Sequence, residues 1–187
     1  MFSALKPGLT LFAVSAIAAL ALSFTYMITE KPIEAQNAAA QERSRLELLP
    51  DADTFEEMDV TSARAVTSAL KGKADGRTVG YVIGISVSGY GGVMDMLVGV
   101  DDGNAVTGVK IMNHSETPGL GANASQESFT DKYKGKTGPF TVTKSVASGE
   151  NEIDAITSAT ITTTAVTDGV NAAVEFAAAS ARGDVGQ

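Results

Sequence analysis

The sequence predicts an α+β fold with an antiparallel sheet and flanking helices, preceded by one N-terminal transmembrane helix. Three observations support this prediction. The run from Pro7 to Thr29 contains no charged residue. Strand-like segments from Thr78 onward follow one another through glycine turns, without helical patterns between them. The C-terminal stretch has apolar residues at helical spacing, and strands followed by a helix are typical of α+β domains.

The composition excludes several classes of protein. A chain of 187 residues suffices for one domain and a short appendage, and 44% hydrophobic with 19% charged residues excludes a disordered chain. Cysteine is absent and histidine occurs once, which excludes disulfides, cysteine-held clusters and multi-histidine metal sites. We therefore expect no metal centre. The net charge of −8 argues against nucleic acid as a partner.

The uncharged run predicts a membrane anchor over residues 1–30, in contact with membrane lipid. A hydrocarbon core needs about 20 apolar residues, which this run supplies. A cleaved signal peptide is the alternative, but its shorter apolar region would be followed directly by a small-residue cleavage site. Here Tyr26, Met27 and Ile28 follow the apolar stretch. A buried core helix is a third reading, and the extreme N-terminal position and lack of a polar face argue against it.

The flanking charges do not decide the orientation of this anchor. Lys6 precedes the span, and Lys31, Arg43 and Arg45 follow it among glutamates, so the count of basic residues gives no firm answer. The short N-terminal tail favours an N-in arrangement. We therefore expect a single-pass protein of the inner cell membrane with its soluble part on the extracytoplasmic side.

The segment after the anchor is expected to be helical. Residues 31–75 begin with a stretch rich in Ala, Glu and Gln, which favours a helix as far as Pro50. The runs TFEEMDV and TSARAVTSALKG that follow are short and mixed in pattern. We assign residues 31–75 to a juxtamembrane helical segment and residues 76–187 to the main domain.

Four strands and a closing helix are expected within residues 76–187. TVGYVIGISVSGYGG reads as a strand ending in a glycine turn, and MDMLVGVD as a second strand. The DGN turn at 102–104 joins it to a third strand in AVTGVKIMNHS, because Asp or Asn with Gly between apolar runs indicates a hairpin. FTVTKSV is the fourth. A helix over 163–182 follows, with apolar positions Val166, Val170, Val174 and Ala177.

Three polar stretches contain more potential chemistry than folding requires. NHSETPGLG at 113–121 puts the single histidine, a carboxylate, a proline and two glycines in one loop. GYGG at 89–92 offers backbone N–H groups and one ring, and DAITSATITTT at 154–164 contains many hydroxyls. Without any function, the glycine-containing stretches would be plain turns and the hydroxyls would cap the helix. The surplus of hydroxyls at a helix start, however, suits a phosphate, which free N–H donors and the positive helix end both favour.

The residues of these stretches resemble one family. DAITSAT from Asp154 to Thr160 resembles the flavinylation motif D-x-x-[ST]-[GS]-A-[TS], and His114 with ETPGLG resembles a second motif of the same family. With GYGG and the VGVD strand, they resemble the G subunit of the Rnf ion-translocating electron-transport complex. A more distant resemblance is to the C subunit of the Na⁺-translocating NADH:quinone reductase. The resemblance covers about residues 80–175 plus the anchor, and it departs at Ser158, where the family more commonly has Gly.

The resemblance implies one covalently bound FMN. A flavin-attaching transferase would link the FMN phosphate to the Thr160 oxygen, with Ser158 and Thr162 as the next candidates. Leu120 would pack on the ring, with Thr117 near its polar edge. His114 would be structural, or would stabilise a reduced flavin. The cofactor-binding residues implied are Thr157, Ser158, Ala159, Thr160, Thr162, Thr163, Glu116, Thr117, Gly119, Leu120, Tyr90 and Gly91.

The resemblance also implies a function. The chain would be a flavoprotein and phosphoprotein that relays electrons within a ferredoxin:NAD⁺ oxidoreductase complex coupled to Na⁺ or H⁺ translocation. Its partners would be the other subunits, and it would complete no reaction alone and contain no catalytic residue. Two alternatives remain at this point. One is a solitary extracytoplasmic FMN-binding electron carrier for another reductase, and the other is an anchored binding module without redox chemistry.

Overall fold

The structure is a computed structural model that describes residues 5–60 and 65–183. The chain divides into two compact units, Met1–Glu42 and Arg43–Gln187. Residues 1–4 of the expected anchor, 61–64 of the expected juxtamembrane segment and 184–187 of the expected main domain lie outside the described residues.

The first element is the long helix α1, Leu5–Leu48. Its stretch Pro7–Thr29 is long and apolar enough to cross a membrane, and large apolar side chains such as Leu11 and Phe12 are exposed along it. Two hydroxyls inside this stretch bond to the helix backbone. Thr25 Oγ1 donates to Ala21 O, and Thr29 Oγ1 donates to Thr25 O, each at 2.9 Å. These internal bonds satisfy polar groups that a hydrocarbon environment could not.

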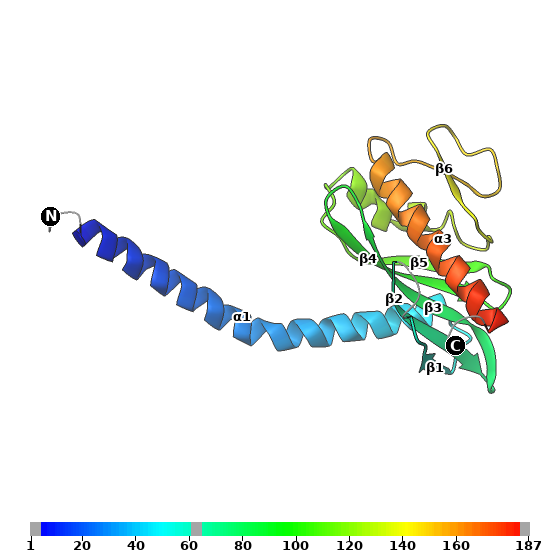
Figure 1. Cartoon of the computed structure of the whole chain (residues 1–187), viewed down its shortest axis with the longest axis horizontal. Helices are drawn as coiled ribbons and strands as arrows, with labels where there is room; N and C mark the ends of the chain where they lie inside the picture. The colour runs from blue at the N-terminus through cyan, green and yellow to red at the C-terminus, as the bar shows by residue number, and fades with distance from the viewer. Residues whose placement is uncertain (1–4, 61–64, 184–187) are drawn as a thin grey trace. The chain divides into compact units, whose positions relative to one another are not determined.

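A five-stranded antiparallel sheet forms the centre of the second unit, with its strands in sequence order (Figure 1). The pairing is most regular between β3 and β4, where Ile83 lies opposite Val98 and Ile85 opposite Met96. Side chains alternate between the two faces because successive residues of a strand point in opposite directions. The strands are β1 Thr54–Glu57, β2 Val66–Ala74, β3 Arg77–Ser88, β4 Val93–Asp101 and β5 Val106–Asn113.

The expectation of a helical segment over 31–75 is wrong beyond Leu48. The helix ends before Pro50 as expected, but the chain then forms β1 and β2. In β2 the sequence VTSALKGKA contains good helix formers, yet Val66, Ala69 and Leu70 are buried in the sheet. Pairing with β3 along the whole strand outweighs the local preference of Ala, Leu and Lys, because propensity is a weak prior against tertiary contacts.

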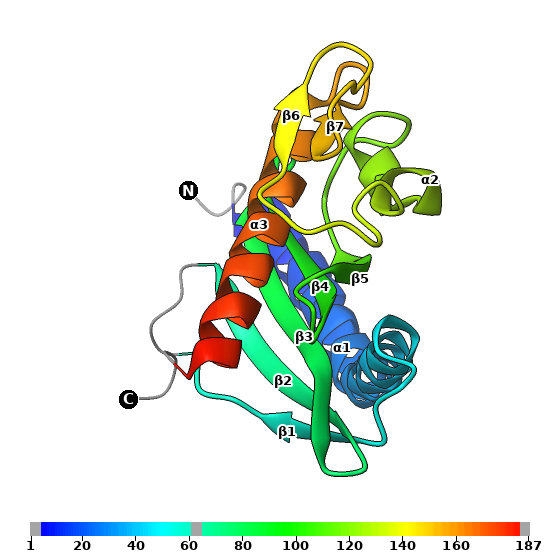
Figure 2. The same ribbon diagram turned by 90° about the vertical axis from the view of Figure 1, so that its right-hand side faces the viewer.

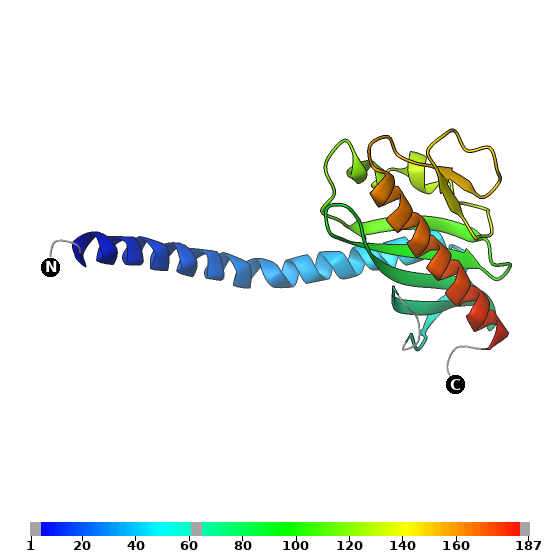
Figure 3. The same ribbon diagram turned by 45° about the horizontal axis from the view of Figure 1, so that its top comes forward.

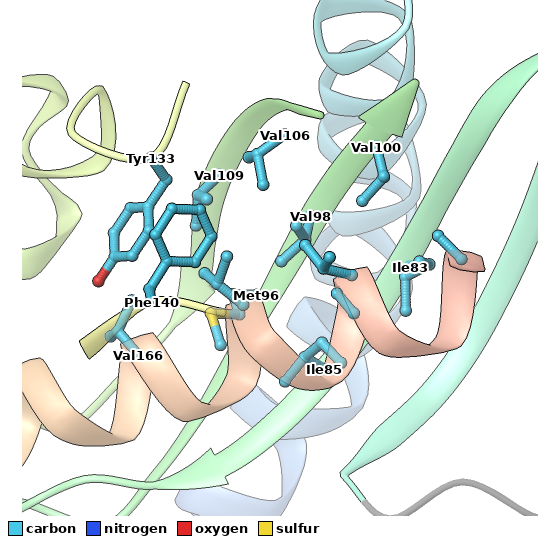
Figure 4. Packing of buried hydrophobic residues seen from close by; sticks show 14 of the residues in the cluster. Ile83, Ile85, Met96, Val98, Val100, Val106, Val109, Tyr133, Phe140 and Val166 are labelled. Atoms are coloured by element: carbon cyan, nitrogen blue, oxygen red, sulfur yellow. The ribbon is translucent and has the colours of Figure 1, made fainter. Parts of the chain in front are cut away.

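Helix α3, Thr160–Arg182, covers one face of the sheet (Figure 3). Its apolar side packs against β3 and β4 in the main core. Figure 4 shows Val166 of the helix beside Met96 and the aromatic side chains. The absence of a side chain at Gly169 permits this packing, because a Cβ there would lie 2.9 Å from Ile85 Cγ2 and even closer to Met96. The helix starts at Thr160, earlier than the expected residue 163.

The opposite face of the sheet receives the residues around Leu48. Leu48 and Leu49 form a second core with Leu70, Val82 and Leu97. Glycines in the strands provide the room for them. A Cβ on Gly99 would lie 2.9 Å from Leu48 Cβ, and one on Gly108 would lie 2.9 Å from Leu48 Cδ2. Thr107 Oγ1 donates to Leu48 O at 2.5 Å, so the chain that enters the domain is both packed and hydrogen-bonded.

The segment between β5 and α3 forms a small lobe beside the N-terminal part of α3 (Figure 2). Tyr133 is buried at its centre, edge-on to Phe129 and Phe140, and its hydroxyl lies 2.8 Å from Thr167 Oγ1 of α3. The fourth expected strand is short and pairs in parallel within this lobe instead of joining the main sheet. The elements are η1 Gly121–Ser125, α2 Glu127–Thr130, β6 Thr141–Thr143 and β7 Glu152–Asp154.

Candidate functional site

The three polar stretches singled out from the sequence meet at one pocket of about 430 Å³. One side comes from the turn between β3 and β4, another from the loop after β5, and the third from the start of α3. This volume lies within the range of roughly 300–1,000 Å³ that is usual for ligand pockets. The lining residues are Tyr90, Glu116, Thr117, Leu120, Gly121, Ser158, Ala159, Thr160, Ile161 and Thr162.

The start of α3 presents free donors to this pocket. Ala159 is the N-cap residue, and no side chain caps the helix. The bond from Thr163 N–H to Ala159 O, at 3.0 Å, opens the hydrogen-bond ladder of the helix. The N–H groups at 160–162 precede it and have no acceptor within the helix. Capping by Ser or Thr, the ordinary reading of the sequence, is therefore absent from this helix start, which is suited to an anion.

The threonine hydroxyls of this region have different roles. Thr162 is fully buried and donates to Glu116 Oε2 at 2.8 Å. Thr163 is also fully buried, and its Oγ1 donates to Ala159 O and accepts from Ile156 N–H, which fixes the turn before the helix. Thr160 is half-buried and lines the pocket. Among the residues that the structure describes, none hydrogen-bonds to the Thr160 hydroxyl.

Glu116 connects the three stretches. The residue is 6% exposed, and its carboxylate accepts one hydrogen bond from Gly91 N–H and one from Thr162 Oγ1, each at 2.8 Å. The backbone N–H of Glu116 donates to His114 Nδ1 at 3.2 Å. His114 does not line the pocket, so the structure gives this histidine a local role in shaping the loop.

Three apolar side chains of the pocket lining, the rim residues, are exposed. Tyr90, Leu120 and Ile161 are 73%, 41% and 58% exposed. They come from the three different stretches, so the rim exists only in the folded domain. The turn that carries Leu120 needs a glycine, since Gly119 has a φ of +79°. Exposed apolar residues around a partly polar pocket suit a ligand with a flat apolar part and a charged end.

Asp154, the first residue of its motif, lies outside the pocket lining. Its Oδ2 lies 2.8 Å from Lys132 Nζ, and the same ammonium lies 5.2 Å from the centre of the Phe129 ring. The hydrogen bond from Lys132 lowers the pKa of the Asp154 carboxyl. This ion pair joins the chain after α2 to the end of β7, which leads into α3.

Most, but not all, of the residues predicted to bind a cofactor line the pocket. Four of the predicted positions, Gly91, Gly119, Thr157 and Thr163, are not part of the lining, although Gly91 contacts Glu116. Gly121 and Ile161 line the pocket and were not predicted. Both lie within the motifs, but the sequence does not show which backbone atoms or side chains face the pocket. The predicted residues that line it are Tyr90, Glu116, Thr117, Leu120, Ser158, Ala159, Thr160 and Thr162.

Comparison with known proteins identifies the family. Residues 89–175 match the FMN-binding domain, and residues 1–48 match the RnfG N-terminal region. The chain is 37% identical to the G subunit of the Na⁺-translocating ferredoxin:NAD⁺ oxidoreductase complex of Acetobacterium woodii, over 91% of this chain and 89% of that protein. This chain belongs to the G-subunit family of ion-translocating oxidoreductase complexes.

Further relatives agree with this assignment. The G subunit of the proton-translocating ferredoxin:NAD⁺ oxidoreductase complex of Clostridium ljungdahlii is 38% identical, over 85% of this chain and 83% of that protein. The crystal structure of the C subunit of the Na⁺-translocating NADH-quinone reductase from Parabacteroides distasonis has a TM-score of 0.55 at 19% identity, and covers 82% of this chain and 95% of that one. That likeness shows a shared fold. As a G-subunit protein with one apolar helix among its described residues, the chain is a single-pass membrane protein.

The residues present fit FMN. The uncapped start of α3 matches the phosphate, because unpaired N–H groups and the helix dipole both favour an anion. The rim residues Tyr90, Leu120 and Ile161 match the flat ring system. The pocket therefore offers features suited to both parts of an FMN molecule.

Proposed function

We propose that this chain is the FMN-carrying member of an ion-translocating ferredoxin:NAD⁺ oxidoreductase complex, with one FMN attached through its phosphate to Thr160 Oγ1. The observation that supports this most directly is the Thr160 hydroxyl. It lines the pocket, has no hydrogen-bond partner among the described residues, and lies at the first position of an uncapped helix. When bound, FMN supplies the electron-transfer chemistry, which no side chain provides.

The neighbouring hydroxyls are poorer attachment points. Thr162 is fully buried and already bonded to Glu116, so an ester there would disrupt a core contact. Ser158 is exposed, but it precedes the helix and has a φ of +62°, which sets it apart from the row of free N–H groups. Thr160 combines partial exposure with a place beside those donors.

Different residues of the chain would hold the two parts of the cofactor. The N–H groups at 160–162 would hold the phosphate, while Tyr90, Leu120 and Ile161 would orient the ring and exclude water from its apolar part. With FMN held in this way, the chain would serve as an electron relay among the other subunits. Family membership favours this role over a solitary carrier or a binding module without redox chemistry.

Attachment needs a flavin transferase with access to Thr160. Thr157 and Ser158 are exposed beside it, so the motif can be reached from solvent in the folded domain. We further propose that this domain lies on the extracytoplasmic side of the membrane. An ester bond suits that location, because a domain outside the cytoplasm cannot replace a lost cofactor from a pool of free flavin.

Localisation of the flavin by mass spectrometry tests the attachment site. Trypsin cuts after Lys144 and Arg182 and at no position between them, so one peptide, 145–182, contains all three candidate hydroxyls. Its fragmentation spectrum should place FMN on Thr160. Flavin on Ser158 or Thr162, or on another peptide, would contradict the proposal.

A further inference from the structure

The attachment of FMN at Thr160 does not involve the Glu116 carboxylate. We infer that Glu116 is a fixed negative charge in the wall of the pocket that lowers the reduction potential of the flavin held there. This inference rests on the proposed function, since it requires FMN in the pocket. It assigns to Glu116 a tuning role that is separate from holding the phosphate or covering the ring.

The hydrogen-bond partners of Glu116 suit an ionised carboxylate. Oε1 accepts from Gly91 N–H and Oε2 accepts from Thr162 Oγ1. An ionised carboxylate has only acceptor oxygens, and here each oxygen faces a donor. Both donors are neutral, so they orient the charge and offset it only in part.

No cation accompanies this charge in the described part of the chain. Among the residues that line the pocket, Glu116 has the one carboxyl side chain, and no Lys, Arg or His belongs to the lining. Three ion pairs of described residues, Lys73–Glu56, Lys110–Glu47 and Lys132–Asp154, involve no residue of the pocket lining. A buried carboxylate without an ion-pair partner is costly to retain in a folded protein, because burial removes its hydration.

The backbone around Glu116 is shaped to hold it. A Cβ on Gly89 would collide with Oε1, and a Cβ on Gly121 would collide with Oε2 and lie 2.8 Å from Thr162 Oγ1. Glycine at both positions therefore leaves the space that the carboxylate fills. The charge is held between the turn after β3, the loop after β5 and the start of α3, so it cannot move away when the flavin accepts an electron.

A fixed negative charge affects the oxidised and reduced flavin differently. Reduction adds electron density to the ring, and a negative charge without an ion-pair partner in the wall of the pocket repels it. The positive end of α3 acts in the opposite direction, but it faces the phosphate, whose charge does not change on reduction. Glu116 therefore lowers the potential, and removal of its charge raises the potential.

Two substitutions separate the charge from the packing. Glu116→Gln keeps the shape: its oxygen can accept from Gly91 N–H and its amide can donate to Thr162 Oγ1. Thr162→Val keeps the charge but deletes one donor, so the carboxylate is less neutralised. We expect opposite shifts, upward for Glu116→Gln and downward for Thr162→Val. Loosening of the pocket by itself would shift both variants in the same direction.

The experiment is a redox titration of the full-length chain in detergent, co-produced with a flavin transferase, with intact mass used to verify the FMN in each variant. We expect Glu116→Gln to change the ratio of oxidised to reduced flavin at fixed ambient potential by about tenfold, or about +59 mV for a one-electron step. Glu127→Gln is the matched control, because it removes a charge from an exposed position on α2 outside the pocket lining.

The outcomes are distinct. An unchanged or lower potential in loaded Glu116→Gln overturns the inference and leaves the proposed function intact. Wild-type protein without FMN contradicts the proposed function and this inference with it. If Glu116→Gln does not retain flavin, Thr162→Val decides: a lower potential supports the fixed charge, and an unchanged or higher one overturns it.

Discussion

At the scale of single residues, the turn before α3 depends on an unusual backbone conformation. Ser158 has a φ of +62°, in the left-handed region that favours glycine. Glycine is the commoner residue at this position of the motif that the chain resembles, and the structure supplies the reason. The motif needs a left-handed residue so that the chain can turn from β7 into the first turn of α3 and place Thr160 in the pocket.

Substitutions at residue 158 test this requirement. Ser158→Gly should leave the free energy of unfolding within about 1 kcal/mol of the wild type, because relief of the left-handed strain and the greater freedom of unfolded glycine oppose each other. Ser158→Val should cost about 1–3 kcal/mol, since a β-branched residue tolerates this conformation poorly. Urea unfolding followed by tyrosine fluorescence measures both. Equal stability of the Val and Gly variants would show that the turn relaxes.

At the scale of elements, the second face of the sheet fixes the chain that enters the domain. The Cβ position of Gly99 is 2.9 Å from Leu48 Cβ and 3.0 Å from Leu48 O, and Thr107 donates to the same carbonyl. The strand glycines are thus required by the close approach of Leu48 and, at Gly99, of the Thr107 side chain as well. Without that approach, Leu48 and Leu49 would lose their cover in the second core.

Gly99→Ala should therefore lower the free energy of unfolding by about 1–3 kcal/mol, the usual cost of overpacking a core. The extra methyl group would displace Leu48 and weaken its hydrogen bond with Thr107. Gly103→Ala is the control, because its Cβ would approach only Asp101, at 3.3 Å, in an exposed turn. Thermal unfolding compares the two variants. A Gly99→Ala protein as stable as Gly103→Ala would contradict the packing described for this face.

The ion pair of the lobe predicts a dependence on pH. Lys132 lowers the pKa of Asp154, so the pair stabilises the folded chain above the unfolded Asp pKa of about 3.9. That stability is lost as the pH falls through the lowered folded pKa, where Asp154 becomes protonated. Lys132→Met, which keeps contact with Phe129, should cost about 0.2–1 kcal/mol at pH 7. Urea unfolding at pH 7 and in acid should show this difference shrinking in acid; a constant difference would assign it to packing.

The sequence predicts an element well when the residues that decide its structure lie within the element itself. The strands from Thr78 to Asn113 and the closing helix follow from residue spacing, because burial on one face leaves a periodic pattern. Strand β2 cannot be predicted in this way, because its own residues do not favour a strand and it is pairing with β3 that makes it one. FTVTKSV likewise resembles a sheet strand, but only Thr141–Thr143 pairs, and it pairs with β7.

The candidate site is predictable in its motifs and not in its contacts. The stretches at 89–92, 113–121 and 154–164 stand out because their residue types exceed the needs of turns and caps. The hydrogen bond from Thr162 to Glu116 spans 46 residues of sequence, so no local pattern indicates it. The same holds for the pairing of Lys132 with Asp154. Tertiary contacts between distant segments decide which hydroxyl is buried and which is free.

At the scale of the whole molecule, the chain combines one membrane helix with one FMN-binding domain. The exposed apolar stretch Pro7–Thr29 belongs in lipid, and the second unit, Arg43–Gln187, contains the complete pocket. Relatives in the G-subunit family are parts of ion-translocating complexes, which agrees with an anchored electron relay. The flanking charges leave the orientation open, so it needs a direct measurement.

We expect the FMN domain to be digested by protease added to spheroplasts and to be protected in inverted membrane vesicles. The benefit of covalent retention outside the cytoplasm favours this orientation. A cytoplasmic protein followed in the same samples controls for lysis. Digestion in inverted vesicles alone would reverse the assigned orientation without affecting the pocket.

The intact mass of the denatured chain, produced with a flavin transferase, tests the central claim most directly. An ester at Thr160 survives denaturation, so the wild type should gain the mass of one FMN less one water. Thr160→Ser retains a hydroxyl and should show the same gain, whereas Thr160→Ala should fold and show none. A wild-type chain without added mass, or a Thr160→Ala chain that still carries it, would contradict covalent attachment at Thr160.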